Sequence, residues 1–208
     1  MIEDHPIFLE SMRFIRSKIS QNNFTELETK VLERLIHTSG DFSIQNLLIF
    51  SENACEIGIK AIQNKVPILT DTDMAAAAIK SMAARAGVNQ IFSASKWFEQ
   101  QKDFSKTKTA FGIMRGWMEI SKYNYGDKAP IVIFGSSPTA LEEFLTSLEN
   151  TDRKPSLIVG MPVGFIGVEQ SKKRLIKSNQ NYIVLGSTRG GAAMAGATIN
   201  ALLRSSIQ

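Results

Sequence analysis

The chain has 208 residues, of which 43% are hydrophobic, 21% charged and 8% aromatic, so it can bury one sizeable core and is not biased toward disorder. Its 24 Lys and Arg residues against 20 Asp and Glu residues give a formal net charge of +4, which favours a small anionic ligand. The longest basic run, Lys172-Lys173-Arg174, has no aromatic residues interleaved with it, which argues against a nucleic-acid partner.

Two amphipathic helices are predicted at the start of the chain. Apolar residues recur at spacings of three and four over residues 6–19, the pattern of a helix with one buried face. The second helix begins with a capping box formed by Thr25 and Glu28. Gly40 supplies the left-handed residue at which that helix stops.

From residue 66 onward, short apolar runs alternate with helical patterns, which is typical of βα units packed into a parallel sheet. The last three runs each end in a glycine and lead into a loop and then a helix. We therefore expect one α/β domain over residues 1–208, with ligand-binding loops at the carboxyl edge of the sheet. The predicted strands cover residues 66–70, 90–93, 131–134, 157–159 and 182–185, after a further short strand at 47–50 and a helix at 54–63.

His37 lies in the last turn of the second predicted helix. Because the carbonyl end of a helix carries about half a negative charge, this position predicts that the imidazolium form is favoured. A histidine that holds a proton near neutral pH can deliver it as a general acid. The alternative is a histidine that only hydrogen-bonds the last carbonyls of its helix.

The loop after the last predicted strand, residues 186–191, is a candidate anion site. The hydroxyls of Ser187 and Thr188, the guanidinium of Arg189 and the free N–H groups of the following helix suit a carboxylate or phosphate. The alternative is a tight turn in which the glycines serve close packing. Residues 135–139, Gly-Ser-Ser-Pro-Thr, form a similar but weaker candidate.

Metal and nucleotide sites find little support in the sequence. One cysteine, Cys55, and two histidines, His5 and His37, are too few for the usual zinc sites, and a lone cysteine is typical of a reducing compartment. Asp71 and Asp73 are candidates for binding Mg²⁺. Such a pair before a helix is more often one residue that caps the helix and a neighbouring acid that the helix dipole favours. No Gly-x-Gly-x-x-Gly follows a strand and no phosphate-binding Gly-x-x-x-x-Gly-Lys-Ser/Thr loop is present. We expect no metal and no cofactor.

The sequence also gives expectations about location. Its charge-free stretches fall short of the roughly 18 apolar residues that span a bilayer. It begins Met-Ile-Glu-Asp-His-Pro, which is acidic where a signal peptide is basic. We therefore expect a cytoplasmic protein that does not cross a membrane.

Several motifs, taken in order, resemble the precorrin-8X methylmutase family and its counterpart, cobalt-precorrin-8 methylmutase. The resemblance spans nearly the whole chain and depends on the order and spacing of the motifs together. The motifs are Ser11 and Arg16; Arg34-Leu-Ile-His-Thr-Ser-Gly40; Leu69-Thr-Asp-Thr-Asp-Met74; Gly135 with Pro138-Thr-Ala-Leu141; Lys154-Pro155; Gly160-Met-Pro-Val-Gly-Phe-Ile-Gly167 with Ser171-Lys172; and Arg189-Gly-Gly191 with Asn200-Ala-Leu202.

The resemblance implies an isomerase of cobalamin biosynthesis. Such an enzyme moves a methyl group from C-11 to C-12 of precorrin-8X, giving hydrogenobyrinate, or of cobalt-precorrin-8, giving cobyrinate. The 1,5-sigmatropic shift needs no external cofactor, and His37 takes the place of the family's catalytic histidine, which is thought to protonate a ring nitrogen beside the migrating group. The resemblance also implies a doubly wound, flavodoxin-like fold and a homodimer with the site near the subunit interface.

The family's substrate-contacting serine corresponds to Ser11, and its Thr-Arg pair corresponds to Thr107-Lys108, where lysine keeps the charge but loses the planar fork. Acetate and propionate groups on the macrocycle explain why the site needs cations. The expected substrate-binding residues are Ser11, Arg16, Thr107, Lys108, Ser187, Arg189, Gly190 and Gly191.

Two other functions stay open at this point. The chain could be a corrinoid-binding or carrier protein that keeps the pocket without turnover. Setting the resemblance aside, it could be a flavodoxin-like module that binds a phosphorylated nucleotide at residues 186–191.

Overall fold

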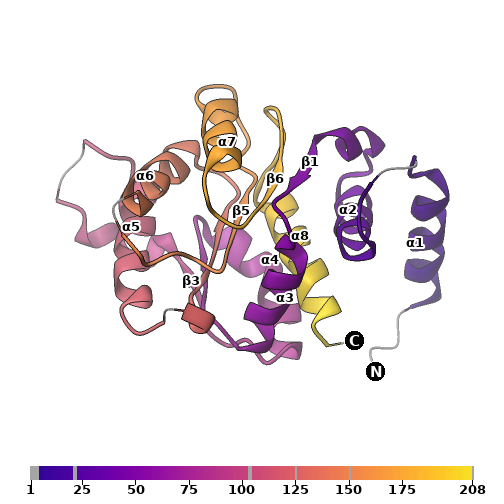
Figure 1. The fold of residues 1–208 in the computed structure, drawn as a ribbon, viewed down its shortest axis with the longest axis horizontal. Helices are drawn as coiled ribbons and strands as arrows, with labels where there is room; N and C mark the ends of the chain where they lie inside the picture. The colour runs from indigo at the N-terminus through magenta and orange to yellow at the C-terminus, as the bar shows by residue number, and fades with distance from the viewer. Residues whose placement is uncertain (1–4, 21–22, 103–104, 125, 150, 208) are drawn as a thin grey trace.

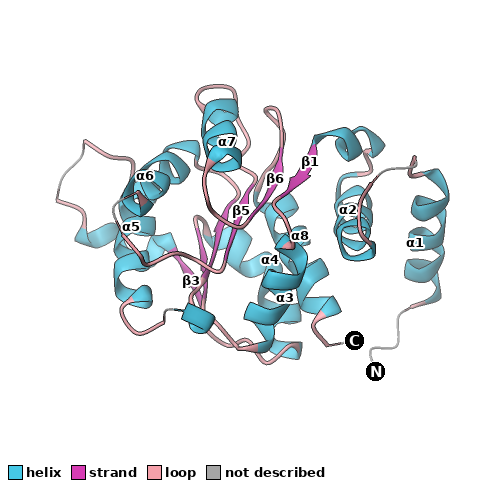
Figure 2. Ribbon diagram, in the orientation of Figure 1, coloured by secondary structure: helices cyan, strands magenta, loops and turns pink. Residues whose placement is uncertain are grey.

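The computed structural model describes residues 5–20, 23–102, 105–124, 126–149 and 151–207. A single sheet runs through the middle of the chain and helices cover both of its faces (Figure 2). Residues 1–4, on which the expectation about a signal peptide was based, lie outside the described residues. The strands are β1 (Leu48–Phe50), β2 (Ile68–Thr70), β3 (Ile91–Ser93), β4 (Ile131–Phe134), β5 (Leu157–Gly160) and β6 (Tyr182–Leu185).

The strand order across the sheet is β1-β6-β5-β4-β2-β3. Strands β2 to β6 are all parallel to one another, and the outer strand β1 pairs antiparallel with β6. The predicted α/β fold with a mainly parallel sheet is therefore confirmed. Counted among themselves, the five parallel strands follow the order 2-1-3-4-5 of flavodoxin-like sheets. In this order β3 is added on one side of β2 and the later strands on the other, so the strand order reverses between β2 and β4.

Two hydrophobic clusters sandwich the sheet because successive strand residues point to opposite faces. On β2, for example, Ile68 belongs to one cluster and Leu69 to the other. Helices α3, α4 and α8 pack on the first face, and α5, α6 and α7 on the second (Figure 1). Their bounds are α3 (Ala54–Gln63), α4 (Asp73–Arg85), α5 (Lys108–Ser121), α6 (Pro138–Leu148), α7 (Val168–Lys177) and α8 (Ala192–Ser205), with 3-10 helices η1 (Phe42–Leu47), η2 (Ala94–Gln100) and η3 (Gly126–Lys128).

The N-terminal helices α1 (Pro6–Lys18) and α2 (Glu26–Ser39) form an outer layer beside α8 (Figure 1). The predicted capping box is present: Thr25 N donates to Glu28 Oε2 at 2.8 Å, and Glu28 N donates to Thr25 Oγ1 at 3.3 Å. Gly40 ends α2 with a φ of 67°, a conformation that favours glycine. Among the described helices, none has the length and apolar character needed to cross a bilayer.

Candidate active site

A pocket of about 470 Å³ lies between α1 and the C-terminal end of α2. It brings together Ser11 and His37, which come from different helices. Ser11 Oγ donates to Ile7 O at 2.9 Å, and its lone pairs remain able to accept a hydrogen bond. The other walls are mostly apolar. The lining residues are Ile7, Glu10, Ser11, Phe14, Ile15, Ile36, His37, Gly40 and Phe42.

The end of α2 places His37 at the pocket. The left-handed turn at Gly40 stops the helix three residues after His37, as the sequence predicts. Asp41 then begins the next element, because its Oδ1 accepts from Ser43 N at 2.8 Å and caps η1. The chain therefore turns away sharply and leaves His37 exposed on the last turn of the helix.

The protonation state of His37 differs from the prediction. Partial burial of the ring is the main cause that lowers the pKa of His37 below its usual 6.5, and the positive charge of Arg34 lowers it further. The ring of Phe8 covers one side of the imidazole, with the ring centroids 5.5 Å apart. The direction of this shift is opposite to the one predicted from the helix end, so the expectation of a favoured imidazolium in the free protein is not met. A neutral imidazole has one donor and one acceptor nitrogen.

Arg189 reaches the rim of this pocket from the loop between β6 and α8. Its guanidinium donates to Asp41 Oδ2 and, at 3.0 Å, to Ser43 Oγ. Asp41 lies between Gly40 and Phe42, which both line the pocket. A cation from the last βα loop thus lies beside the end of the helix that carries His37.

The glycines of the same loop have structural roles of their own. A Cβ at Gly190 would lie 2.1 Å from Met161 O, so only glycine fits at this close approach. The N–H of Gly191 donates to Met161 O at 2.9 Å and is therefore not a free anion-binding group. The close-packing alternative explains Gly190, whereas a Cβ at Gly191 would meet nothing within 4 Å and glycine is favoured there by a φ of 120°. Ser187 is exposed with a φ of 59°.

Arg16 is used inside the protein. Its guanidinium donates to Glu33 and, at 2.8 Å, to Glu26, and both acids belong to α2. The hydrogen bond that Arg16 donates to Glu33, followed by the one it donates to Glu26, raises the pKa of Arg16. This ion-pair network fixes α1 on α2, and Arg16 is not among the residues that line the pocket beside it. The geometry therefore favours a structural role over the predicted direct contact with substrate.

Thr107 and Lys108 lie on the other side of the sheet from α1 and α2, where α5 begins (Figure 1). Thr107 caps α5, since its Oγ1 accepts from Ala110 N at 3.2 Å, and it shares a 3.1 Å hydrogen bond with Thr139 Oγ1. Thr107 also lines a second pocket of about 320 Å³, together with Ile166. Lys108 is exposed at the first position of the helix. Within one chain, the structure does not bring these two residues to His37.

A sequence model described as precorrin-8X methylmutase matches residues 6–205 of the chain. The chain belongs to the precorrin-8X methylmutase family. Among individual relatives, it is 33% identical over 202 residues to a cobalt-precorrin-8 methylmutase of Methanocaldococcus jannaschii, a match that covers 93% of this chain and 90% of the relative. It is 29% identical over 198 residues to a precorrin-8X methylmutase of Pseudomonas aeruginosa, covering 94% of this chain and 93% of the relative.

The fold agrees with this family assignment. A crystal structure of a precorrin-8X methylmutase from Thermus thermophilus superimposes with a TM-score of 0.84 at 28% identity. The match covers 96% of this chain and 95% of the crystallised one.

The point where this precorrin-8X methylmutase fold reverses its strand order holds a buried carboxylate. Asp71 Oδ2, at the end of β2, accepts from the N–H groups of Gly135, Ser136 and Ser137 at 3.0, 2.6 and 3.0 Å. Burial raises the pKa of Asp71, and the three N–H groups oppose that rise. The anion site predicted at residues 135–139 is therefore filled from within, which disfavours a nucleotide phosphate there.

Asp71 and Asp73, the candidate Mg²⁺ pair of the sequence, each accept hydrogen bonds from within the protein. Asp73 lies at the first position of α4 and accepts from the hydroxyl of Ser95, while Thr72 caps the helix. In the described part of the chain, no group of three His, Cys, Asp or Glu side chains is arranged to hold a metal ion. The role of Asp71 was missed because its partners lie 64 or more residues away in the sequence.

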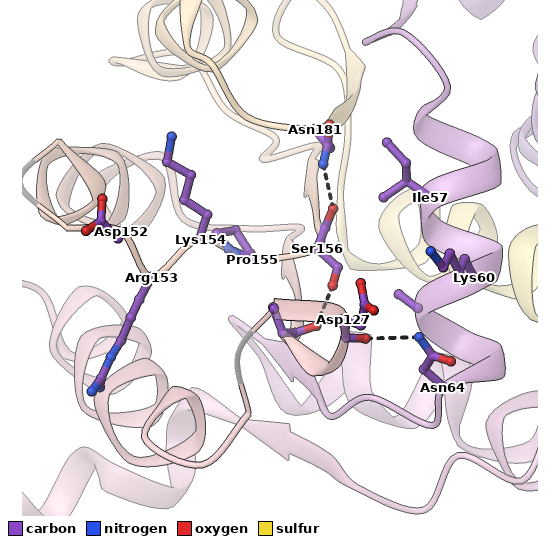
Figure 3. A pocket seen from close by; sticks show the side chains of 13 residues that line it. Ile57, Lys60, Asn64, Asp127, Asp152, Arg153, Lys154, Pro155, Ser156 and Asn181 are labelled. Atoms are coloured by element: carbon purple, nitrogen blue, oxygen red, sulfur yellow. Dashed lines mark hydrogen bonds between the residues drawn. The ribbon is translucent and has the colours of Figure 1, made fainter.

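A larger pocket, of about 620 Å³, opens at the end of the sheet opposite to the carboxyl ends of the parallel strands (Figure 3). It lies between α3 and the loops that lead into β4, β5 and β6, at the amino ends of the parallel strands. Side-chain amides inside it are bonded internally: Asn64 donates to Asp127 O at 3.0 Å, and Asn181 donates to Ser156 O at 3.1 Å. It contains none of the predicted site residues of this methylmutase-family chain.

Proposed function

We propose that this chain is a methylmutase that moves a methyl group from C-11 to C-12 of a precorrin-8X-type macrocycle, as an isomerase of cobalamin biosynthesis. The observation that carries the proposal is the pocket shared by Ser11 and His37, in a chain of the precorrin-8X methylmutase family. The reaction rearranges one molecule, so no external cofactor is part of the proposal. We further propose that the enzyme works in the cytoplasm.

His37 supplies the proton chemistry in this proposal. In the free protein its lowered pKa keeps the imidazole mostly neutral at pH 7. A substrate that carries many carboxylates brings negative charge to the pocket, which offsets the charge of Arg34 and raises the pKa of His37. The imidazolium then protonates a ring nitrogen beside the migrating methyl group. The nitrogen returns the proton once the methyl group has moved, so reactant and product have the same composition.

The remaining residues bind and orient the macrocycle. Ser11 Oγ accepts a hydrogen bond beside His37, and the apolar walls contributed by Ile7 and Phe14 contact the face of the ring. Arg189 exchanges part of its pairing with Asp41 for a peripheral carboxylate of the substrate. The hydroxyl of Ser187 and the amino group of Lys108 are further exposed donors for such carboxylates.

We infer that the active unit is a homodimer in which a second copy completes each site. Ile7 and Phe14 at the mouth of the pocket are 67% and 57% exposed, although they are large apolar side chains. Thr107 and Lys108 lie at the start of α5, on the other face of the sheet from α1 and α2, and a two-fold pairing can bring them to the partner's pocket. Each dimer then has two equivalent sites.

A complementation assay tests this shared site. Neither His37→Asn nor Lys108→Ala alone forms a fully intact site, but a mixed dimer regenerates one complete site if the two residues come from different subunits. Random mixing should restore about one quarter of the wild-type activity. Light scattering gives the oligomeric state, and a fully active monomer would contradict the shared site.

Conversion of purified substrates tests the proposed reaction itself. Precorrin-8X and cobalt-precorrin-8 are each incubated with the protein alone, and the visible spectrum reports formation of the conjugated corrin. The relatives carry both names, so both substrate forms belong in the assay. Tight binding of the product without any conversion of either substrate would instead support the carrier alternative.

A further inference from the structure

Lys172, on α7, is a buried cation that is bonded to main-chain carbonyls. The residue is 1% exposed, and its Nζ donates to Ser187 O at 2.8 Å and to Arg189 O. None of the ion pairs found between described residues includes Lys172. The nearby acid Glu169 is paired with the exposed Lys173 instead, at 3.6 Å.

A charge in this position is not explained by packing of the core. Burial lowers the pKa of Lys172 to about 8, which shows that the surroundings oppose the charged form. Replacing a buried charge with an apolar side chain of similar volume is often neutral or stabilising. What Lys172 does provide is two charge-assisted hydrogen bonds to one loop.

That loop, residues 186–191, has a backbone shape that depends on contacts from outside it. Ser187 has a φ of 59°, a left-handed conformation that side chains other than glycine rarely adopt. The loop is also bonded to residues 161–164, since Gly164 N donates to Thr188 O at 3.2 Å. Lys172 holds the carbonyls on either side of Thr188, and so fixes the most strained part of the loop.

Arg189 is held at both ends by these contacts. Its carbonyl accepts from Lys172, while its guanidinium donates to Asp41 and Ser43 at the rim of the pocket. A loop released from Lys172 would leave Arg189 free to change rotamer and main-chain position together. The direction of the guanidinium therefore depends on a residue that does not itself reach the pocket.

We propose that Lys172 is a positioning residue, which holds the carbonyls of Ser187 and Arg189 so that the Arg189 guanidinium faces a carboxylate of the bound macrocycle. This inference rests on the proposed function. It adds to that function a buried side chain that acts only through the loop.

Lys172→Met, which keeps an unbranched side chain only one atom shorter and removes the ammonium, is compared with Lys173→Met on the exposed neighbour. Hydrogenobyrinate, the coloured product of the proposed reaction, serves as the probe in absorbance titrations. Lys172→Met should raise the Kd of this probe and the KM of the substrate by about 10- to 100-fold, the usual effect of losing a charged hydrogen bond, while kcat stays within a few fold. Lys173→Met should stay within about twofold in each quantity. Amide exchange of residues 186–191 should accelerate only in Lys172→Met.

A double-mutant cycle with Arg189→Gln separates positioning from a general loss of stability. If Lys172 acts through Arg189, the double variant binds the probe no more weakly than Arg189→Gln alone. Additive losses, or a Lys172→Met protein with wild-type binding and wild-type exchange, would overturn the positioning role. A wild-type protein that neither binds the probe nor converts substrate would overturn the proposed function, which is a different result.

Discussion

Phe8 meets His37 edge to face, with the two rings inclined at 81° and their centroids 5.5 Å apart. The guanidinium groups of Arg34 and Arg204 lie 5.7 and 5.0 Å from the centre of the same Phe8 ring. A single aromatic side chain of α1 thus joins α1 to α2 and α8 beside the candidate catalytic histidine. Its ring lies against one side of the imidazole, and burial is the main cause of the lowered pKa of His37.

Removing this ring should change the titration of His37. In Phe8→Ala we expect the pKa of His37 to rise toward 6.5, because the desolvation that lowers it is relieved. NMR titration of the imidazole resonances measures the pKa directly. Leu9→Ala, a neighbouring change on α1 outside the pocket lining, is the matched control and should leave the pKa in place. Equal pKa values in the two variants would show that Phe8 is not what shields the ring.

His37→Asn should lower kcat by about a hundred- to ten-thousand-fold, the range typical of losing a general acid or base. Binding of hydrogenobyrinate should change little, since the expected carboxylate contacts are made by other residues. His5→Asn is the control, because His5 caps the start of α1 and asparagine can replace it there. Turnover by His37→Asn within a few fold of wild type would remove His37 from the mechanism.

The pH dependence should differ between the free enzyme and the complex. If His37 acts as an acid, kcat/KM falls as the pH rises through the pKa of the free enzyme, which lies below 6.5. The fall in kcat should come at a higher pH, because the carboxylates of the bound substrate raise the pKa. Both profiles come from initial rates between pH 5 and 9, a range chosen to bracket the usual histidine pKa of about 6.5. If kcat/KM and kcat fell at the same pH, the proposed effect of the substrate on the pKa of His37 would be contradicted.

The two arginines predicted to bind substrate should behave differently. Arg16→Gln removes a bridge between α1 and α2 and should mainly lower the free energy of unfolding, by about 1 kcal/mol because the guanidinium is half exposed. Arg189→Gln should instead raise KM about tenfold or more, and more steeply at low salt. Urea denaturation and steady-state kinetics of both variants distinguish these outcomes. A large KM effect in Arg16→Gln alone would restore Arg16 to the binding site.

Asp71→Ala should destabilise the fold by roughly 2–4 kcal/mol, because it leaves three N–H groups at the start of α6 without their acceptor. Asp73→Ala, two residues later, removes an acid that is mostly exposed and should cost much less. Chemical denaturation measures both changes. If both variants lost a similar free energy of unfolding, the hydrogen bonds of Asp71 would contribute no more to stability than those of the exposed Asp73.

Local signals in the sequence placed the elements of the site correctly. The capping box at Thr25 and the stop at Gly40 fix both ends of α2 through contacts within a few residues, so the position of His37 on its last turn was predictable. The parallel strands were equally visible as short apolar runs between helical patterns. The family resemblance, in contrast, was needed to assign Ser11 and His37 to the same site, since no sequence pattern relates a residue on α1 to a residue on α2.

The contacts that set the chemistry were not predictable from local patterns. Burial and the charge of Arg34 lower the pKa of His37, and the Phe8 ring of α1 lies against the imidazole, whereas the helix-end rule describes only α2. Arg16 looked like a free cation because Glu33, its buried partner, is 17 residues away on another helix. These interactions exist only after the helices have packed, and a single sequence carries no periodic signal for them.

Both outer strands of the sheet, β1 and β3, are only three residues long. Each therefore presents few unpaired main-chain groups to another chain, which is a known protection against edge-to-edge aggregation. A second copy of the chain finds almost no strand edge to extend, so its contacts have to be made by side chains on the helices and loops. In the proposed homodimer, single substitutions on those surfaces should therefore separate the subunits while every strand of the sheet stays paired as it is.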